Sequence, residues 1–149
     1  MINKLLVKGS STRRGFKLKV DLEIELDLAL GISGETGAGK TTLLRVIAGL
    51  DPKFQGRVQF GDEVWLNNID SRKIVLPTYK RHLGVVFQES RLLPGKSVLE
   101  NLEYAERRAS QSGLHVPRGE ILEELSLKKL LTQPAESLSG GECQRVALG

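Results

Sequence analysis

The fold is decided by eight residues, Gly34-Glu35-Thr36-Gly37-Ala38-Gly39-Lys40-Thr41. They fit the pattern G-x-x-x-x-G-K-[ST], in which glycines let the backbone curl so that successive N–H groups point at an anion. An apolar run precedes the loop and an amphipathic segment follows it, so the loop is expected between a strand and a helix. The helix N-terminus adds unpaired N–H donors and the positive end of its dipole. The sequence therefore predicts a loop that binds the phosphates of a nucleotide.

Three side chains at the start of the following helix suit this ligand. Lys40 would bring a compact positive charge to the β- and γ-phosphates, and the Thr41 hydroxyl can ligate Mg²⁺. Thr42 is placed to donate to the α-phosphate. The alternative is a plain glycine-rich turn whose lysine is solvated, and the pattern with its context favours the nucleotide. The loop alone does not choose among ATPases, GTPases and small-molecule kinases.

The segments around the loop have patterns of strands and of one helix. Residues 16–24 alternate apolar and mostly charged side chains, which predicts a half-buried antiparallel strand near a sheet edge. Residues 28–33 and 83–88 are nearly continuous apolar runs, typical of strands covered on both faces. Helical spacing of leucine and isoleucine predicts a helix over residues 40–50.

The next segments read as a hairpin and then as helices. Two short β segments, 57–60 and 63–66, are joined by Gly61-Asp62, a hairpin turn signal. Ser97 with Glu100 is a capping-box pattern that opens a helix. Leu99, Leu102 and Ala105 are expected on one face of that helix. A second helix is predicted from Pro117 to Leu125.

Composition excludes several classes of protein. Of the 149 residues, 40% are hydrophobic and 27% charged, which argues against a disordered chain. No apolar run approaches a membrane span, and the first residues do not read as a secretory signal. The single cysteine favours a reducing, cytoplasmic compartment. The formal charge of +4 comes from interspersed residues, so we expect no nucleic-acid partner.

A second glycine motif lies near the end of the chain, in Leu138-Ser139-Gly140-Gly141-Glu142-Cys143-Gln144-Arg145. A serine hydroxyl, bare glycine amides and a helix N-terminus together can hold an anion. Equally, Ser139 could simply cap its helix while the glycines complete a turn. The octet resembles the signature motif of ATP-binding cassette (ABC) ATPases.

Between the two motifs, Val86-Phe87-Gln88 resembles the Q-loop of the same family, with Leu92-Leu93-Pro94 following as in many importer ATPases.

The resemblance implies an α/β fold, a P-loop NTPase of the ABC ATPase type. It would comprise an N-terminal antiparallel β subdomain with the P-loop core over residues 1–95 and a helical subdomain over 96–137. The signature motif and the start of its helix would occupy 138–149.

The resemblance also implies roles for individual residues, with ATP and Mg²⁺ as ligands. The loop Gly34–Thr41 and Thr42 would hold ATP, with Lys40 catalytic. Gln88 would act in catalysis and at the metal with Thr41. Ser139, Gly140 and Gly141 would contact ATP bound to a second copy of the chain, in a head-to-tail homodimer. Phe16, the one aromatic residue near the N-terminal strand, would stack on adenine, or else pack in the core.

The partner implied by the resemblance is a transmembrane permease, beneath which the ATPase would sit peripherally at the cytoplasmic face of the membrane. Arg81–Pro94, Ser97–Leu102, Val64–Leu66 and Leu138–Gly149 are similar to molybdate importer ATPases, with sulfate, polyamine and sugar importers as close competitors.

Family members carry an Asp-Glu pair about twenty residues after the signature motif and a histidine further on, and this chain ends at Gly149 before them. Neither His82 nor His115 can replace that histidine, and both are expected at the surface. We therefore expect a fragment of a longer ATPase that binds nucleotide weakly and hydrolyses it negligibly. The alternatives are a soluble ABC-type ATPase, disfavoured by the short segment 89–137, and a non-hydrolysing nucleotide-binding module.

Overall fold

The computed structural model describes residues 4–13, 15–26, 29–89, 91–109 and 117–149. They form two compact units, Met1–Leu83 and Gly84–Gly149. The first unit contains the glycine-rich loop.

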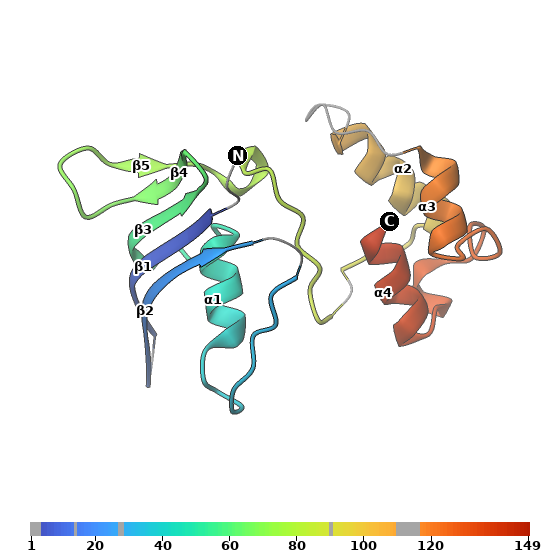
Figure 1. Cartoon of the computed structure of the whole chain (residues 1–149). Coiled ribbons are helices and arrows are strands. Elements are labelled where there is room, and N and C mark those ends of the chain that lie inside the picture. The colour runs from blue at the N-terminus through green and yellow to red at the C-terminus, as the bar shows by residue number, and fades with distance from the viewer. Residues whose placement is uncertain (1–3, 14, 27–28, 90, 110–116) are drawn as a thin grey trace. The chain divides into compact units, whose positions relative to one another are not determined.

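The first unit is built on an antiparallel sheet with the strand order β2-β1-β3-β4-β5 (Figure 1). The predicted strand at 16–24 is confirmed: it is β2, it pairs with β1 and it lies at one edge of the sheet. The predicted hairpin is confirmed as β3 and β4. The sequence pattern does not predict the first strand or the short last one. The strands are β1 (Lys4–Arg13), β2 (Phe16–Glu25), β3 (Gln55–Phe60), β4 (Glu63–Asn67) and β5 (Ile74–Val75).

Helix α1 (Lys40–Ile47) covers one face of this sheet (Figure 1). Val46 of the helix is buried, and Leu43 and Ile47 pack beside it on the sheet's core. Burying an aliphatic or aromatic side chain stabilises a fold by about 1.5–3 kcal/mol, so this apolar face holds α1 on the sheet. The buried core residues of the unit are Leu5, Val7, Val46, Phe54, Val58, Trp65 and Leu66.

The helix ends three residues before the predicted limit of residue 50. Gly49 lies in the left-handed region with φ +75°, a conformation that glycine adopts without a side-chain clash. Its N–H donates to the Val46 carbonyl at 3.0 Å, and the Leu50 N–H donates to the Arg45 carbonyl at 2.8 Å. The chain therefore leaves the helix at Gly49.

The strands predicted at 28–33 and 83–88 are wrong for the residues that the structure describes, of which Leu28 is not one. Residues 29–33 and 83–87 have no regular secondary structure. Leu30 is 52% exposed and Val86 47%. A strand needs a partner for its backbone groups, and the sheet ladders among the described residues join only β1 to β5. Apolar composition alone therefore misled the prediction.

The second unit is helical, with α2 (Val98–Ala109), α3 (Arg118–Glu124) and α4 (Gly140–Leu148). Its buried core consists of Val98, Leu102, Leu127, Leu130 and Val146. All three helices start where the capping patterns or Pro117 predict. Of the residues expected on one face of α2, Leu102 is buried, Leu99 is half-buried and Ala105 is exposed; Val98 is buried as well.

The capping box of α2 forms as the sequence predicts. The backbone N–H of Ser97 donates to the Glu100 carboxylate at 2.8 Å. That hydrogen bond, with those from Lys96 and the Ser97 hydroxyl, lowers the pKa of Glu100 to about 2. In the part of the chain that the structure describes, no helix combines the length and the apolar character needed to cross a bilayer.

Candidate nucleotide-binding site

The glycine-rich loop lies between β2 and α1, with residues 34–38 exposed. Gly39 is the N-cap residue of α1 and has φ +96°, in the left-handed region. No side chain caps this helix, and no acidic residue lies in its first turn. The N–H groups at the start of α1 therefore have no competing side-chain acceptor there, and the positive end of the helix dipole faces the loop.

The Lys40 ammonium folds back over the loop. It donates to the carbonyl oxygens of Gly34 and Glu35, each at 2.7 Å. No ion pair found among the described residues includes Lys40. Its positive charge is therefore held in place but not neutralised, which is what binding of a phosphate needs. Thr41 is exposed and Thr42 half-buried on the first turn of α1.

Phe16, the first residue of β2, lies against the glycine-rich loop. A Cβ atom built on Gly39 would lie only 2.7 Å from Cζ of the Phe16 ring and 3.1 Å from Leu18 Cδ1. Glycine at position 39 thus permits both the positive φ and the close approach of the ring. Among the described side chains, Leu18 and Val20 pack on the core of the unit, but Phe16 is not part of that set. The ring therefore lies beside the loop, half-buried.

The second glycine motif belongs to the other unit, where Ser139 caps α4. Its N–H donates to the Glu142 carboxylate at 2.8 Å and its hydroxyl donates to the same oxygen at 2.6 Å. The Glu142 N–H closes the capping box by donating to the Ser139 hydroxyl at 3.4 Å. The hydrogen bonds from the Ser139 hydroxyl and backbone lower the pKa of Glu142. The capping role considered for Ser139 is therefore present.

The two glycines after Ser139 are not required by the packing of the unit. A Cβ atom at Gly140 or at Gly141 would meet nothing within 4 Å. Both residues are exposed in the first turn of α4, and neither has a positive φ. An alanine would favour the helix more than a glycine does. The described contacts of this chain therefore do not require glycine at either position.

Gln88 also belongs to the second unit. It is exposed, and because residues 83–87 form no strand, it does not lie at a strand exit as the sequence analysis expected. The segment after it is fixed to α2 by Asn101, which is 8% exposed. The Asn101 carboxamide accepts from the Leu93 N–H at 2.6 Å and donates to the Ser97 carbonyl at 2.9 Å.

The sequence analysis missed Asn101, whose only signal is a polar side chain beside the apolar residues of α2. No local pattern marks Arg81, whose guanidinium is also buried.

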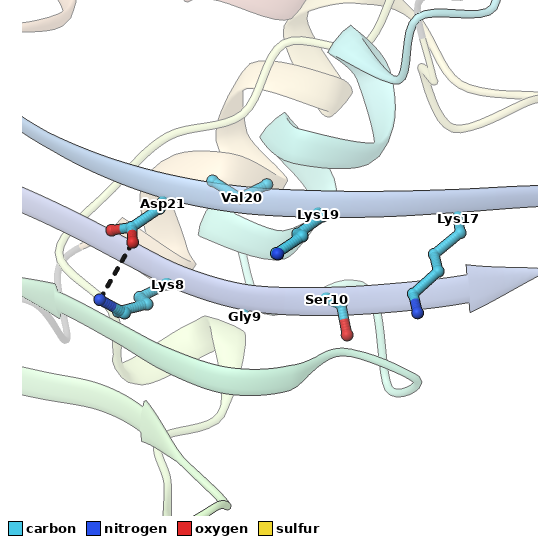
Figure 2. A pocket seen from close by; sticks show the side chains of 7 residues that line it. All are labelled: Lys8, Gly9, Ser10, Lys17, Lys19, Val20 and Asp21. Carbon is cyan, nitrogen blue, oxygen red and sulfur yellow. Dashed lines mark ion pairs between the residues drawn. The ribbon is translucent and has the colours of Figure 1, made fainter.

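A shallow hollow on the sheet is not part of this site. It lies over β1 and β2, and Figure 2 shows the Lys8–Asp21 ion pair within it. None of the predicted nucleotide-binding residues lines it. Its lining residues are Lys8, Gly9, Ser10, Lys17, Lys19, Val20 and Asp21.

Among the described residues, no group of three or more His, Cys, Asp or Glu side chains is placed to hold a metal ion. His82 is exposed, as expected, and His115 lies outside the described residues. The candidate metal ligands Thr41 and Gln88 bear neutral oxygen atoms, which suit Mg²⁺ together with phosphate oxygens and water.

Most of the chain is similar to one known family of proteins. Residues 18–149 match the family model described as ABC transporter. The chain is 44% identical over 134 residues to the molybdenum import ATP-binding protein ModC of Methylococcus capsulatus. This alignment covers 90% of this chain and 36% of that protein. For the ModC of Hahella chejuensis, the identity is 40% over 93% of this chain and 38% of that protein. The chain thus spans little more than a third of the length of these curated relatives.

A solved structure shows the same fold. It is that of cbiO1 from Clostridium perfringens, part of the ABC transporter complex cbiONQ, with a TM-score of 0.63 at 20% sequence identity. The match covers 99% of this chain and 59% of the other. Together with the match over residues 18–149, these findings show that the chain belongs to the ABC transporter family of ATP-binding proteins.

Proposed function

We propose that this chain is the nucleotide-binding part of an ABC importer ATPase, and that it binds Mg²⁺ and ATP at residues 34–42. The observation that carries the proposal is the Lys40 ammonium, held over the loop by the Gly34 and Glu35 carbonyls at the uncapped start of α1. An ammonium, a helix N-terminus and bare loop amides form a site for a polyphosphate.

Each predicted residue has a role in this proposal. Amides of the loop Gly34, Glu35, Thr36, Gly37, Ala38 and Gly39 surround the β-phosphate, and Lys40 stabilises the negative charge of the β- and γ-phosphates. Mg²⁺ would neutralise phosphate charge when bound, and the Thr41 hydroxyl and the Gln88 amide oxygen would be its protein ligands. Thr42 donates to the α-phosphate. Phe16, whose ring lies against Gly39, stacks on the adenine.

The signature residues Ser139, Gly140 and Gly141 act on ATP held by a second copy of the chain in a homodimer. The open space around both glycines supports this role, because a phosphate can approach their backbone amides without meeting a side chain. The Ser139 hydroxyl lies at the same helix end and could exchange its Glu142 partner for a phosphate oxygen.

The remaining parts of the proposal rest on the relatives. Two curated relatives are molybdenum import ATP-binding proteins at 40–44% identity, which supports molybdate or another oxyanion as the solute. A transmembrane permease would be the partner, with this protein peripheral to it at the cytoplasmic face of the membrane. The subdomains would be residues 1–95, 96–137 and 138–149. Residues 1–149 alone would bind ATP weakly and turn it over negligibly.

Titration of Mg-ATP into the complete protein that contains this chain, followed by calorimetry, tests the proposal. We expect saturable binding that weakens at least about ten-fold, or 1.4 kcal/mol, in Lys40→Ala, because the charge beside the phosphates is lost. Lys53→Ala is the matched control, since its side chain is exposed and outside the loop. Equal affinity of Lys40→Ala and the wild type would contradict the proposal.

A further inference from the structure

Arg81 is a charged side chain buried without a carboxylate. It is 5% exposed, and none of the ion pairs among the described residues includes it. Its guanidinium donates instead to four backbone carbonyls. They are those of Leu76 at 3.1 Å, Val46 at 3.3 Å, Ile47 at 2.5 Å and Trp65 at 3.5 Å.

Two of these carbonyls belong to the last turn of α1. Carbonyls at a helix C-terminus lack intrahelical partners and carry the negative end of the dipole, so a guanidinium is favourable there. The end of the helix also leaves space for it. A Cβ atom at Gly49 would lie 2.5 Å from Cζ of Arg81, so a larger residue at that turn would displace the guanidinium.

The other two carbonyls belong to a different part of the unit. Trp65 is in β4, and its ring lies 5.6 Å from Arg81 Cζ. Leu76 directly follows β5, and its N–H donates to the Trp65 carbonyl at 2.8 Å. Arg81 therefore joins the C-terminal end of α1 to strand β4, through Trp65, and to the segment that follows β5, through Leu76. Only a planar fork with several donors can bridge carbonyls in this way.

The same helix carries the candidate nucleotide site at its opposite end. It has eight residues, beginning at Lys40. A helix so short is marginal by itself, and its placement depends on tertiary contacts. Its apolar side is fixed by Leu43, Val46 and Ile47 on the sheet. Rotation and sliding along the axis are opposed by polar contacts at its end, where Arg81 binds two carbonyls.

We propose that Arg81 is a positioning residue for the nucleotide site: by fixing the C-terminal end of α1, it sets the position of Lys40 and Thr41 at the other end. This inference rests on the proposed function. Arg81 touches no nucleotide in this arrangement and acts through the helix alone.

The test compares three variants of the complete protein by calorimetry with Mg-ATP and by thermal unfolding. In Arg81→Met, which removes the guanidinium that joins the four carbonyls, we expect the affinity for Mg-ATP to fall about ten-fold. In Arg81→Lys, which keeps the charge but cannot fork, we expect a loss of about three-fold. Val58→Ala is the control, because Val58 is fully buried in β3 and its truncation destabilises the same unit. We expect its affinity to stay within about two-fold of the wild type.

The outcomes separate the two proposals. Failure of the wild type to bind, or equal binding by Lys40→Ala, overturns the proposed function. Normal binding by the wild type together with undiminished affinity of both Arg81 variants overturns the role of Arg81. The role of Arg81 is also overturned if Val58→Ala loses as much affinity for Mg-ATP as the Arg81 variants do at a similar melting temperature. If Arg81→Met does not fold, the comparison of Arg81→Lys with Val58→Ala decides by the same criteria.

Discussion

Asp51 shows how one residue holds two parts of the first unit together. Its carboxylate is fully buried as a side chain. It accepts from the Ser11 hydroxyl at 2.8 Å, from the Lys53 N–H at 3.2 Å and from the Arg13 guanidinium at 3.2 Å. Burial by itself raises the pKa of Asp51, but these hydrogen bonds and the Arg13 charge outweigh it, and the net effect is a lowered pKa.

The lowered pKa predicts an acid-dependent loss of stability. A carboxyl whose pKa is lower in the folded state stabilises the fold above its unfolded pKa of 3.8, and this contribution is lost as the pH falls through the folded value. Asp51→Asn should therefore cost about 1–3 kcal/mol at pH 7 and flatten the pH dependence below pH 4. Urea unfolding at pH 7 and pH 3 measures both effects. Asp62→Asn, in the exposed hairpin turn, should keep the wild-type slope.

Residues of the site differ in how far the sequence alone predicts them. Gly34, Lys40 and Thr41 follow from a local pattern, because their geometry depends on neighbours within eight residues. Arg81 does not, since its partner Ile47 is 34 positions away in the sequence. Phe16 is an intermediate case: the resemblance to ABC ATPases makes it a candidate, but only the structure shows its ring against Gly39.

At the scale of one element, a substitution at the start of α4 is expected to raise stability while it weakens ATP-dependent dimerisation. Gly141→Ala adds a methyl group to open space in a helix. It should raise the stability of the helical unit by up to about 1 kcal/mol, through helix propensity. If Gly141 faces the nucleotide of a second copy, the same change should weaken ATP-dependent dimerisation. Sedimentation velocity with and without Mg-ATP, alongside thermal unfolding, measures both.

Gly119→Ala provides the matched control for this element. Gly119 also lies in the first turn of a helix, α3, and its added Cβ would also meet nothing within 4 Å. This variant should gain stability and keep its dimerisation. Loss of dimerisation in Gly119→Ala, or its retention in Gly141→Ala, would remove the support for a role of the signature glycines between copies.

Elements with a local cause were predicted well from the sequence. The starts of α2 and α4 follow from the hydrogen bonds of Ser97 and Ser139 within three residues. The strand β2 follows from its alternation. The runs 28–33 and 83–88 failed because a strand depends on a partner that is distant in sequence, and apolar composition says nothing of whether one is present.

At the scale of the whole molecule, the apolar runs 28–33 and 83–88 predict that residues 1–149 aggregate when they are produced alone. Leu30, Ile32, Val85 and Val86 are each 38–52% exposed, and unpaired apolar segments favour aggregation. We expect this chain by itself to bind a hydrophobic dye and to self-associate. The combined substitution Leu30→Lys and Val86→Lys should reduce both, as measured by dye fluorescence and light scattering.

In the complete protein, the combined substitution Leu30→Lys and Val86→Lys should be destabilising. Its relatives are more than twice as long as this chain, so further residues are available to cover the two runs. There the same lysines would be buried and should lower the melting temperature. Unchanged stability of the complete protein would show that these runs stay exposed in it.

The hold of the loop carbonyls on Lys40 has a consequence for the entropy of binding. A free lysine side chain loses about 1.5–2 kcal/mol of rotamer entropy when it becomes ordered. Here the ammonium already has two fixed partners, at 2.7 Å each, before a phosphate arrives. Most of that loss therefore belongs to folding rather than to binding. The arrival of a phosphate then adds a partner to a charge that is already in position, and the calorimetric signature should be dominated by enthalpy.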